Sequence, residues 1–208
     1  TLFSPKIIRL MIELKSISKK FIANIFEDFS YTFKKNNIYF LSGINGSGKT
    51  TLLKLIKGIY LCDRGEIIFD YNLKQKNDVA FIDGNFRTFF HRLTVYQNLQ
   101  YFHSLQSKNN CFESIDNLLS LFNVSILRDK VFSSLSQGQM QLVSIIRGFS
   151  SNPKVILLDE VFSSLDIENK KMVMKYISEY VLNEGAVIIF TSHEDNHDEI
   201  IFKELSLS

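Results

Sequence analysis

One short stretch constrains the fold of this chain more than any other. Residues 43–50 read Gly-Ile-Asn-Gly-Ser-Gly-Lys-Thr, which fits the phosphate-binding pattern of Gly, four residues, then Gly-Lys-Ser/Thr. The four apolar residues before it, 38–41, predict a buried strand. The apolar spacing over residues 52–59 predicts a helix directly after it. Strand, glycine-rich loop and helix in this order are the context in which the pattern binds nucleotide phosphates.

The residue types in the loop suit this chemistry. Its glycines allow positive φ, so that backbone N–H groups can turn inward and, with the helix N-terminus, surround an anion. Lys49 would place its ammonium on the β- and γ-phosphates, which makes it a candidate catalytic residue, and Thr50 would offer its hydroxyl to Mg²⁺. The residues predicted to bind nucleotide here are Gly43, Asn45, Gly46, Ser47, Gly48, Lys49, Thr50 and Thr51.

The bulk composition excludes some classes of function. The 208 residues are 45% hydrophobic and 22% charged, which is typical of a globular protein. The net charge of +2 gives no electrostatic reason to expect a nucleic-acid partner. Cys62 and Cys111 are far apart in the sequence, and we expect reduced thiols in a cytosolic protein. Met11 is typical of a natural start, so we expect one domain over residues 11–208 and an added extension or leader at residues 1–10.

The hydrophobic pattern predicts the fold class. Continuous apolar strands alternate with amphipathic helices, as in a parallel sheet covered on both faces. Weak alternation over residues 12–17 predicts an antiparallel strand, and residues 21–33 continue in short strand-like pieces. Helical spacing over residues 93–105 and 112–122 sets the middle of the chain apart. We therefore predict an α/β fold: a P-loop NTPase core with a mainly parallel sheet, an N-terminal antiparallel β portion and an inserted helical subdomain at about residues 86–150.

An acidic pair, Asp159-Glu160, directly follows the apolar run at residues 155–158. Ligands of parallel sheets bind at the carboxyl ends of the strands. Asp159 would hold Mg²⁺ there, and Glu160 would polarise the attacking water as the catalytic base. The alternative is a solvated strand end, and the upstream phosphate loop favours the functional interpretation.

A second candidate anion site is the pentapeptide Leu-Ser-Gln-Gly-Gln at residues 135–139. It opens a predicted helix, where Ser136 and Gly138 leave backbone N–H groups free at the positive end. On its own the pentapeptide fits a capped helix start equally well.

Taken in order, these motifs resemble the nucleotide-binding subunit of ATP-binding cassette (ABC) transporters. Residues 135–139 resemble the signature Leu-Ser-Gly-Gly-Gln, with Gln137 in place of the first Gly. Residues 163–166, Ser-Ser-Leu-Asp, resemble the D-loop, and residues 191–193, Thr-Ser-His, resemble the switch histidine after a strand. Phe21 occupies the place of the aromatic residue that stacks on adenine. The resemblance covers nearly the whole chain.

The resemblance implies a mechanism. Two such subunits, as a homodimer or a heterodimer with another ABC ATPase subunit, would pair head to tail around ATP. Ser136 and Gly138 would contact the γ-phosphate in trans, with Gln139 part of the same nucleotide site. Asp166 would lie at the interface, and His193 would contact the γ-phosphate as a catalytic residue. ATP binding and hydrolysis would drive an integral-membrane permease, which implies a cytoplasmic subunit held on the inner face of the membrane.

The segment Asp83–Asn85 departs from the family pattern, because the family usually places a Gln here that reaches Mg²⁺. Asn85 is the nearest amide and a candidate for Mg²⁺, and Asp83 is a charged alternative. Residues 87–94 resemble ABC-2-type exporters, some of which also lack that Gln, and this favours export. The alternatives are a soluble ABC ATPase outside transport, or a degenerate cassette that binds ATP without turnover. Glu160 and His193 argue against the degenerate form.

Two further features have competing interpretations. Residues 193–197 match the zinc motif His-Glu-x-x-His, but that motif needs a helix and a third ligand, and here it follows a strand. We therefore expect no zinc. The aromatic residues at helical spacing, Tyr96, Tyr101, Phe102 and His103, fit core packing, or in part a groove that receives a transporter helix.

Overall fold

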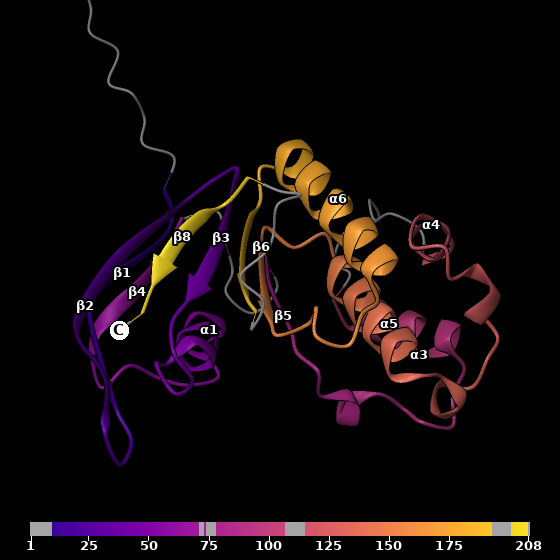
Figure 1. Ribbon diagram of the computed structural model, residues 1–208, viewed down its shortest axis with the longest axis horizontal. Coiled ribbons are helices and arrows are strands. Elements are labelled where there is room, and N and C mark those ends of the chain that lie inside the picture. The colour runs from indigo at the N-terminus through magenta and orange to yellow at the C-terminus, as the bar shows by residue number, and fades with distance from the viewer. Residues whose placement is uncertain (1–9, 71–72, 74–77, 107–114, 193–200, 208) are drawn as a thin grey trace, which may run out of the picture.

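The computed structural model describes residues 10–70, 73, 78–106, 115–192 and 201–207. A five-stranded sheet lies at its centre (Figure 1), with the strand order β5-β6-β7-β3-β8. Every neighbouring pair in this sheet is parallel, which confirms the predicted parallel sheet. Its strands are β3 (Asn37–Ser42), β5 (Val79–Ile82), β6 (Val155–Asp159), β7 (Val187–Thr191) and β8 (Lys203–Ser206).

A second sheet of three antiparallel strands, in the order β2-β1-β4, confirms the predicted antiparallel portion. Its strands are β1 (Leu10–Lys20), β2 (Asn24–Lys34) and β4 (Arg64–Phe69). The expectation of short pieces after residue 21 was wrong, because β2 is one continuous strand. The β1–β2 register shifts at several points, and such bulges offset the apolar alternation that marks a strand in the sequence.

The helices lie on two sides of the parallel sheet (Figure 1). Helix α1 lies beside β3 and the antiparallel sheet, whereas α3, α4 and α5 gather beyond β5 and β6. Short 3-10 turns occur at η1 (Phe86–Thr88), η2 (Ser125–Leu127) and η3 (Phe132–Ser134). The α-helices are α1 (Lys49–Lys57), α3 (Val95–Gln106), α4 (Ile115–Leu121), α5 (Gln137–Phe149) and α6 (Ile167–Glu184).

Strand β6 shows why the sheet is covered on both faces. Ile156 and Leu158 belong to the core formed with α3, α4, α5 and α6. Val155 and Leu157 belong to the core formed with α1 and the antiparallel sheet. All four side chains are buried, and each contributes about 1.5–3 kcal/mol by leaving water. A continuous apolar run in the sequence thus reflects two cores on opposite faces of one strand.

Because the strands are parallel, the candidate site residues that follow them lie at one edge of the sheet. The carboxyl ends of β3, β6 and β7 lie side by side, with Leu41 paired to Thr191 and Asp159 paired to the same Thr191. The phosphate loop and the acidic pair therefore leave the sheet at the same edge, as sheets of this kind require for a ligand site.

Candidate nucleotide-binding site

The phosphate loop connects β3 to α1 through glycines in the left-handed region. Gly46 has φ 86° and Gly48 has φ 97°, which side chains with a Cβ rarely adopt. Gly48 caps α1 without any side-chain hydrogen bond, so the first-turn N–H groups of the helix remain for an external acceptor. A Cβ on Gly48 would lie 2.6 Å from Ile25 Cγ2 and 2.9 Å from Phe26 Cζ. The antiparallel sheet therefore packs directly on the loop.

Lys49 is held along the loop. Its side chain is buried, and Nζ donates to the carbonyl oxygens of Gly43 at 2.6 Å and Ile44 at 3.1 Å. The ammonium has a third N–H, for which the described residues supply no acceptor. The hydroxyl of Ser47 is also buried and has no hydrogen-bond partner among the described residues. An anionic group with several oxygens would satisfy both side chains.

Asp159, at the end of β6, accepts two hydroxyl hydrogen bonds on one oxygen. Thr50 Oγ1 and Thr191 Oγ1 each lie 3.0 Å from Asp159 Oδ1. Burial raises the pKa of Asp159, and these two hydrogen bonds lower it in part. A half-buried carboxylate beside a threonine hydroxyl is a set of hard oxygen donors, which Mg²⁺ prefers. The residues present therefore fit Mg²⁺.

Glu160 follows in an unusual backbone conformation. Its φ is 56°, a region sparsely populated by residues other than glycine. Its N–H donates to Thr191 Oγ1 at 2.9 Å, which fixes the turn. Glu160 lies at a pocket of about 150 Å³ beside the phosphate loop, lined by Asn45, Gly46, Gly48, Lys49, Thr50, Thr51 and Glu160.

Thr191 is a site residue whose role the sequence analysis missed. It was named there only as the start of the switch-histidine motif. The structure shows it fully buried, with its hydroxyl joining Asp159 to the backbone of Glu160. A threonine at the end of one apolar strand, with an acidic pair at the end of another, is the available sequence signal.

Phe21 lies in the turn between β1 and β2 and is half exposed, at 49%. Its ring meets Tyr60 edge to face at 5.4 Å, and Lys19 Nζ lies 5.3 Å from its centroid. The ring is therefore oriented by neighbours while half of its surface stays open for stacking. Tyr60 supports Phe21 and was not predicted.

The signature residues, 135–139, lie at the start of α5 and are not part of the phosphate loop. Ser136 caps α5 in a capping box, in which Gln139 N donates to Ser136 Oγ and Ser136 N donates to Gln139 Oε1. The N–H groups of Gln137 and Gly138 precede the internal hydrogen-bond ladder of the helix and point outward. A Cβ on Gly138 would lie 3.0 Å from the carbonyl oxygen of Ser164, so the signature packs on the D-loop. None of residues 135–139 lines the pocket at the phosphate loop.

The remaining predicted residues have local partners or cannot be placed. Asp166 caps α6 by accepting from Asn169 N at 2.8 Å. Asn85 caps η1 by accepting from Arg87 N at 3.1 Å, and its own N–H donates to Asp83 Oδ1. Neither Asn85 nor Asp83 lines the pocket at the phosphate loop. His193 lies outside the described residues.

Known proteins share this arrangement of motifs. A family model described as "ABC transporter" matches residues 26–163. The lipopolysaccharide export system ATP-binding protein LptB of Haemophilus influenzae is 32% identical over 181 residues, which are 81% of this chain and 74% of that protein. The chain belongs to the ABC transporter family. As a member it is an ABC-type ATPase and binds nucleotide.

Solved structures agree with this ABC ATPase fold. A metal-chelate type ABC transporter in an inward-facing conformation is similar, with a TM-score of 0.79 and 27% identity over 96% of this chain and 80% of that one. A dimeric ATP-binding cassette bound to ADP and Pi in a post-hydrolysis state is also similar, with a TM-score of 0.75 and 20% identity over 88% of each chain. At this identity, the likeness supports the fold alone. Within the described part of this cassette, no helix has the length and hydropathy needed to cross a membrane.

Proposed function

We propose that this ABC ATPase binds MgATP at the phosphate loop, hydrolyses it with Glu160 as general base, and drives transport through a separate integral-membrane permease. The observation that carries the proposal is the joint position of Thr50, Asp159 and Thr191, with Glu160 in the pocket that the phosphate loop lines. Family membership supports the same conclusion.

The chemical steps follow from the side chains. Lys49 binds the β- and γ-phosphates and offsets the charge that develops on them. Glu160 accepts the proton of the attacking water, an effect of about 10²–10⁴-fold for general bases. Mg²⁺, when bound, would be held by Thr50 and Asp159 and would neutralise phosphate charge. We assign no Mg²⁺ contact to Asn85, because its side chain caps η1.

A single chain offers only half of the nucleotide site. Ser136, Gly138 and Gln139 do not line the pocket at the phosphate loop of their own chain. We propose that they meet the γ-phosphate bound by a second ABC ATPase subunit, as a homodimer or a heterodimer. Asp166 then lies at the interface, and His193 contacts the γ-phosphate.

Export is the direction that we favour. The exporter-like residues 87–94 support it, and so does the similarity to LptB, which is part of a lipopolysaccharide export system. Phe90 and Tyr101 are each 43% exposed, and their ring centroids lie 4.9 Å apart, which suits contact with a permease helix.

We further propose that residues 11–208 form one ATPase domain, with residues 86–150 as its helical subdomain. We propose that this domain is located at the inner face of the cell membrane.

The test is purification of the tagged chain from detergent-solubilised membranes, followed by reconstitution with whatever membrane protein accompanies it. We expect an integral-membrane partner and MgATP hydrolysis that disappears in Lys49→Ala. Hydrolysis by a chain that stays with the soluble fraction would favour the alternative of a soluble ABC ATPase. ATP binding without hydrolysis would favour a degenerate cassette.

A further inference from the structure

Helix α5 packs closely against β5 and the residues that follow it. We call residues 83–90 the post-β5 segment; it contains the Asp83–Asn85 departure from the family pattern. A Cβ on Gly148 of α5 would overlap Ile82 Cδ1 at the end of β5. The helix is therefore closely packed on this strand near Gly148, and its other end carries Ser136 of the signature.

Arg147 of α5 joins the helix to the post-β5 segment and to α3. Its guanidinium carbon lies 4.2 Å from the ring centroid of Phe89 and 4.8 Å from that of Phe102. Its Nη1 donates to Thr88 Oγ1 at 2.7 Å. Burial lowers the pKa of Arg147 to about 10 and the Asp83 carboxylate raises it, so the group stays charged at neutral pH.

Gln141 is a second polar residue of α5 turned toward this segment. Its side chain is 1% exposed, and its Oε1 lies 4.0 Å from the position of a Cβ on Gly84. Its Nε2 is buried and has no hydrogen-bond partner among the described residues. A buried amide without a partner is costly, by about 1–3 kcal/mol. An amide group that lacks one hydrogen bond therefore lies at the contact between α5 and the post-β5 segment.

We propose that Arg147 is a positioning residue that couples the signature end of α5 to the post-β5 segment. The inference rests on the proposed function, in which Ser136 engages ATP on a second subunit. When α5 moves with its signature, Arg147 carries Thr88 and Phe89 with it. A planar guanidinium fixed by two rings and one hydrogen bond transmits this movement, whereas the flexible ammonium of a lysine does not.

A single tryptophan can report on the segment, because the chain has none of its own. Phe90→Trp places it at a half-exposed position next to Thr88 and Phe89. In a Glu160→Gln background, MgATP should change its emission, while calorimetry measures ATP affinity separately. In Arg147→Met and Arg147→Lys, we expect this emission change to be lost, with ATP affinity unchanged.

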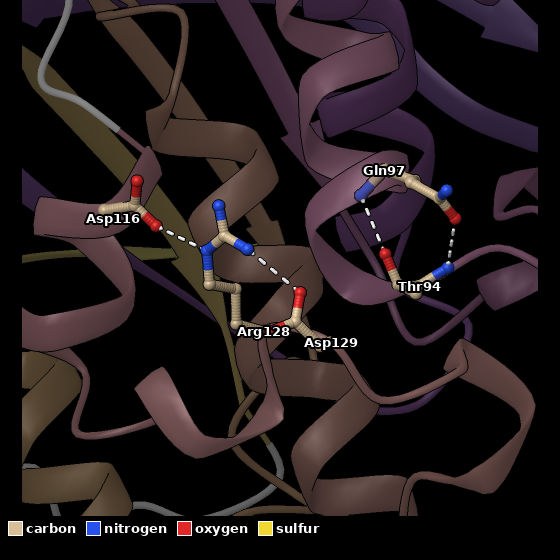
Figure 2. Close-up of polar contacts among 5 residues, drawn as sticks. All are labelled: Thr94, Gln97, Asp116, Arg128 and Asp129. Atoms are coloured by element: carbon tan, nitrogen blue, oxygen red, sulfur yellow. Dashed lines mark hydrogen bonds and ion pairs between the residues drawn. The ribbon is translucent and has the colours of Figure 1, made fainter.

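Arg128→Met is the matched control (Figure 2). Arg128 also stacks on an aromatic ring, at 3.8 Å from the centroid of Tyr96, and is paired with Asp116 and Asp129. Its side-chain hydrogen bonds run to Asp116 and Asp129, and neither residue belongs to the post-β5 segment. This variant should keep the full emission change, which separates a specific link from general loosening of the helices.

The outcomes distinguish the inference from the proposed function. The inference is overturned if either folded Arg147 variant responds like the parent, if Arg128→Met loses the response equally, or if the parent binds ATP with no emission change. Should Arg147→Met fail to fold, the charge-conserving Arg147→Lys decides. A parent that does not bind ATP at all would instead refute the proposed function.

Discussion

Thr191 donates its hydroxyl to Asp159 Oδ1 at 3.0 Å, and the same hydroxyl oxygen accepts the N–H of Glu160 at 2.9 Å. One buried threonine on β7 thus fixes both acidic residues at the end of β6. The unusual φ of 56° at Glu160 is held by this hydrogen bond, because a strained backbone persists only where its surroundings determine it.

Thr191→Val should therefore destabilise the protein and slow its chemistry. Valine has the same shape but cannot accept the part-buried N–H of Glu160, a loss of about 1–3 kcal/mol. We expect the midpoint of thermal unfolding to fall by about 2–4 °C for each kcal/mol, and ATP turnover to drop as Glu160 loses its orientation. Thr191→Ser, which keeps the hydroxyl, is the control and should retain both. Equal behaviour of the two variants would contradict the role given to the hydroxyl.

Asp159→Asn should make the metal-free protein more stable at neutral pH. Burial raises the pKa of Asp159 in the folded chain, so its ionised form is the less favourable one there. The penalty is absent below the pKa of the unfolded chain, near 3.9. It grows as pH rises from there and is complete above the folded-state pKa.

The amide that replaces the carboxylate in Asp159→Asn can still accept from Thr50 and Thr191 but carries no charge. Thermal unfolding in chelator at pH 7 should show a higher midpoint for Asp159→Asn than for the parent, with a smaller difference at pH 4. Mg²⁺ should raise the ATP affinity of the parent more than that of the variant. A variant less stable than the parent at pH 7 would contradict the assigned burial effect.

Phe21→Ala should weaken ATP binding by about 1 kcal/mol, which is about fivefold, through loss of stacking on adenine. Ile22→Ala is the natural control, because Ile22 is in the same turn and fully exposed. Calorimetry with MgATP measures both. An unchanged affinity in Phe21→Ala would mean that the ring only packs on Tyr60.

Lys49→Ala should reduce ATP turnover by about 10²–10³-fold, because the developing phosphate charge loses its buried counter-charge. Lys175→Ala changes an exposed lysine of α6 and should leave turnover as it is. A phosphate-release assay at saturating MgATP compares the two variants. Full activity in Lys49→Ala would contradict a role of the phosphate loop in ATP hydrolysis.

The sequence predicts those features of the fold and the site that depend on residues adjacent in the chain. The phosphate loop, the acidic pair and the capped start at Ser136 are set by neighbouring residues, and the structure places each on the expected element. The continuity of β2 was missed, because bulges in the β1–β2 pairing shift its apolar alternation.

Contacts between distant segments could not be predicted. Thr191 lies 31 residues from Glu160, and Arg147 lies 59 residues from Thr88. The sequence shows Thr191 only as a threonine at the end of an apolar strand, and it does not mark the contact between Arg147 and Thr88. The first contact depends on strand order and the second on the packing of α5 against β5. The helix expected at residues 112–122 is seen from Ile115 to Leu121, and residues 112–114 are outside the described part.

The central claim is that two chains bind ATP between the phosphate loop of one and Ser136 of the other. It is tested most directly by light scattering of Glu160→Gln with and without MgATP. The amide keeps the size of Glu160 but cannot act as a base, so bound ATP is not hydrolysed. The ATP then stabilises whichever of the two states, monomer or dimer, binds it more tightly. We predict that MgATP doubles the mass of Glu160→Gln and leaves Glu160→Gln/Ser136→Arg a monomer, because the arginine would occupy the γ-phosphate position. Equal ATP-dependent dimerisation of both proteins would contradict a phosphate site at Ser136 in trans.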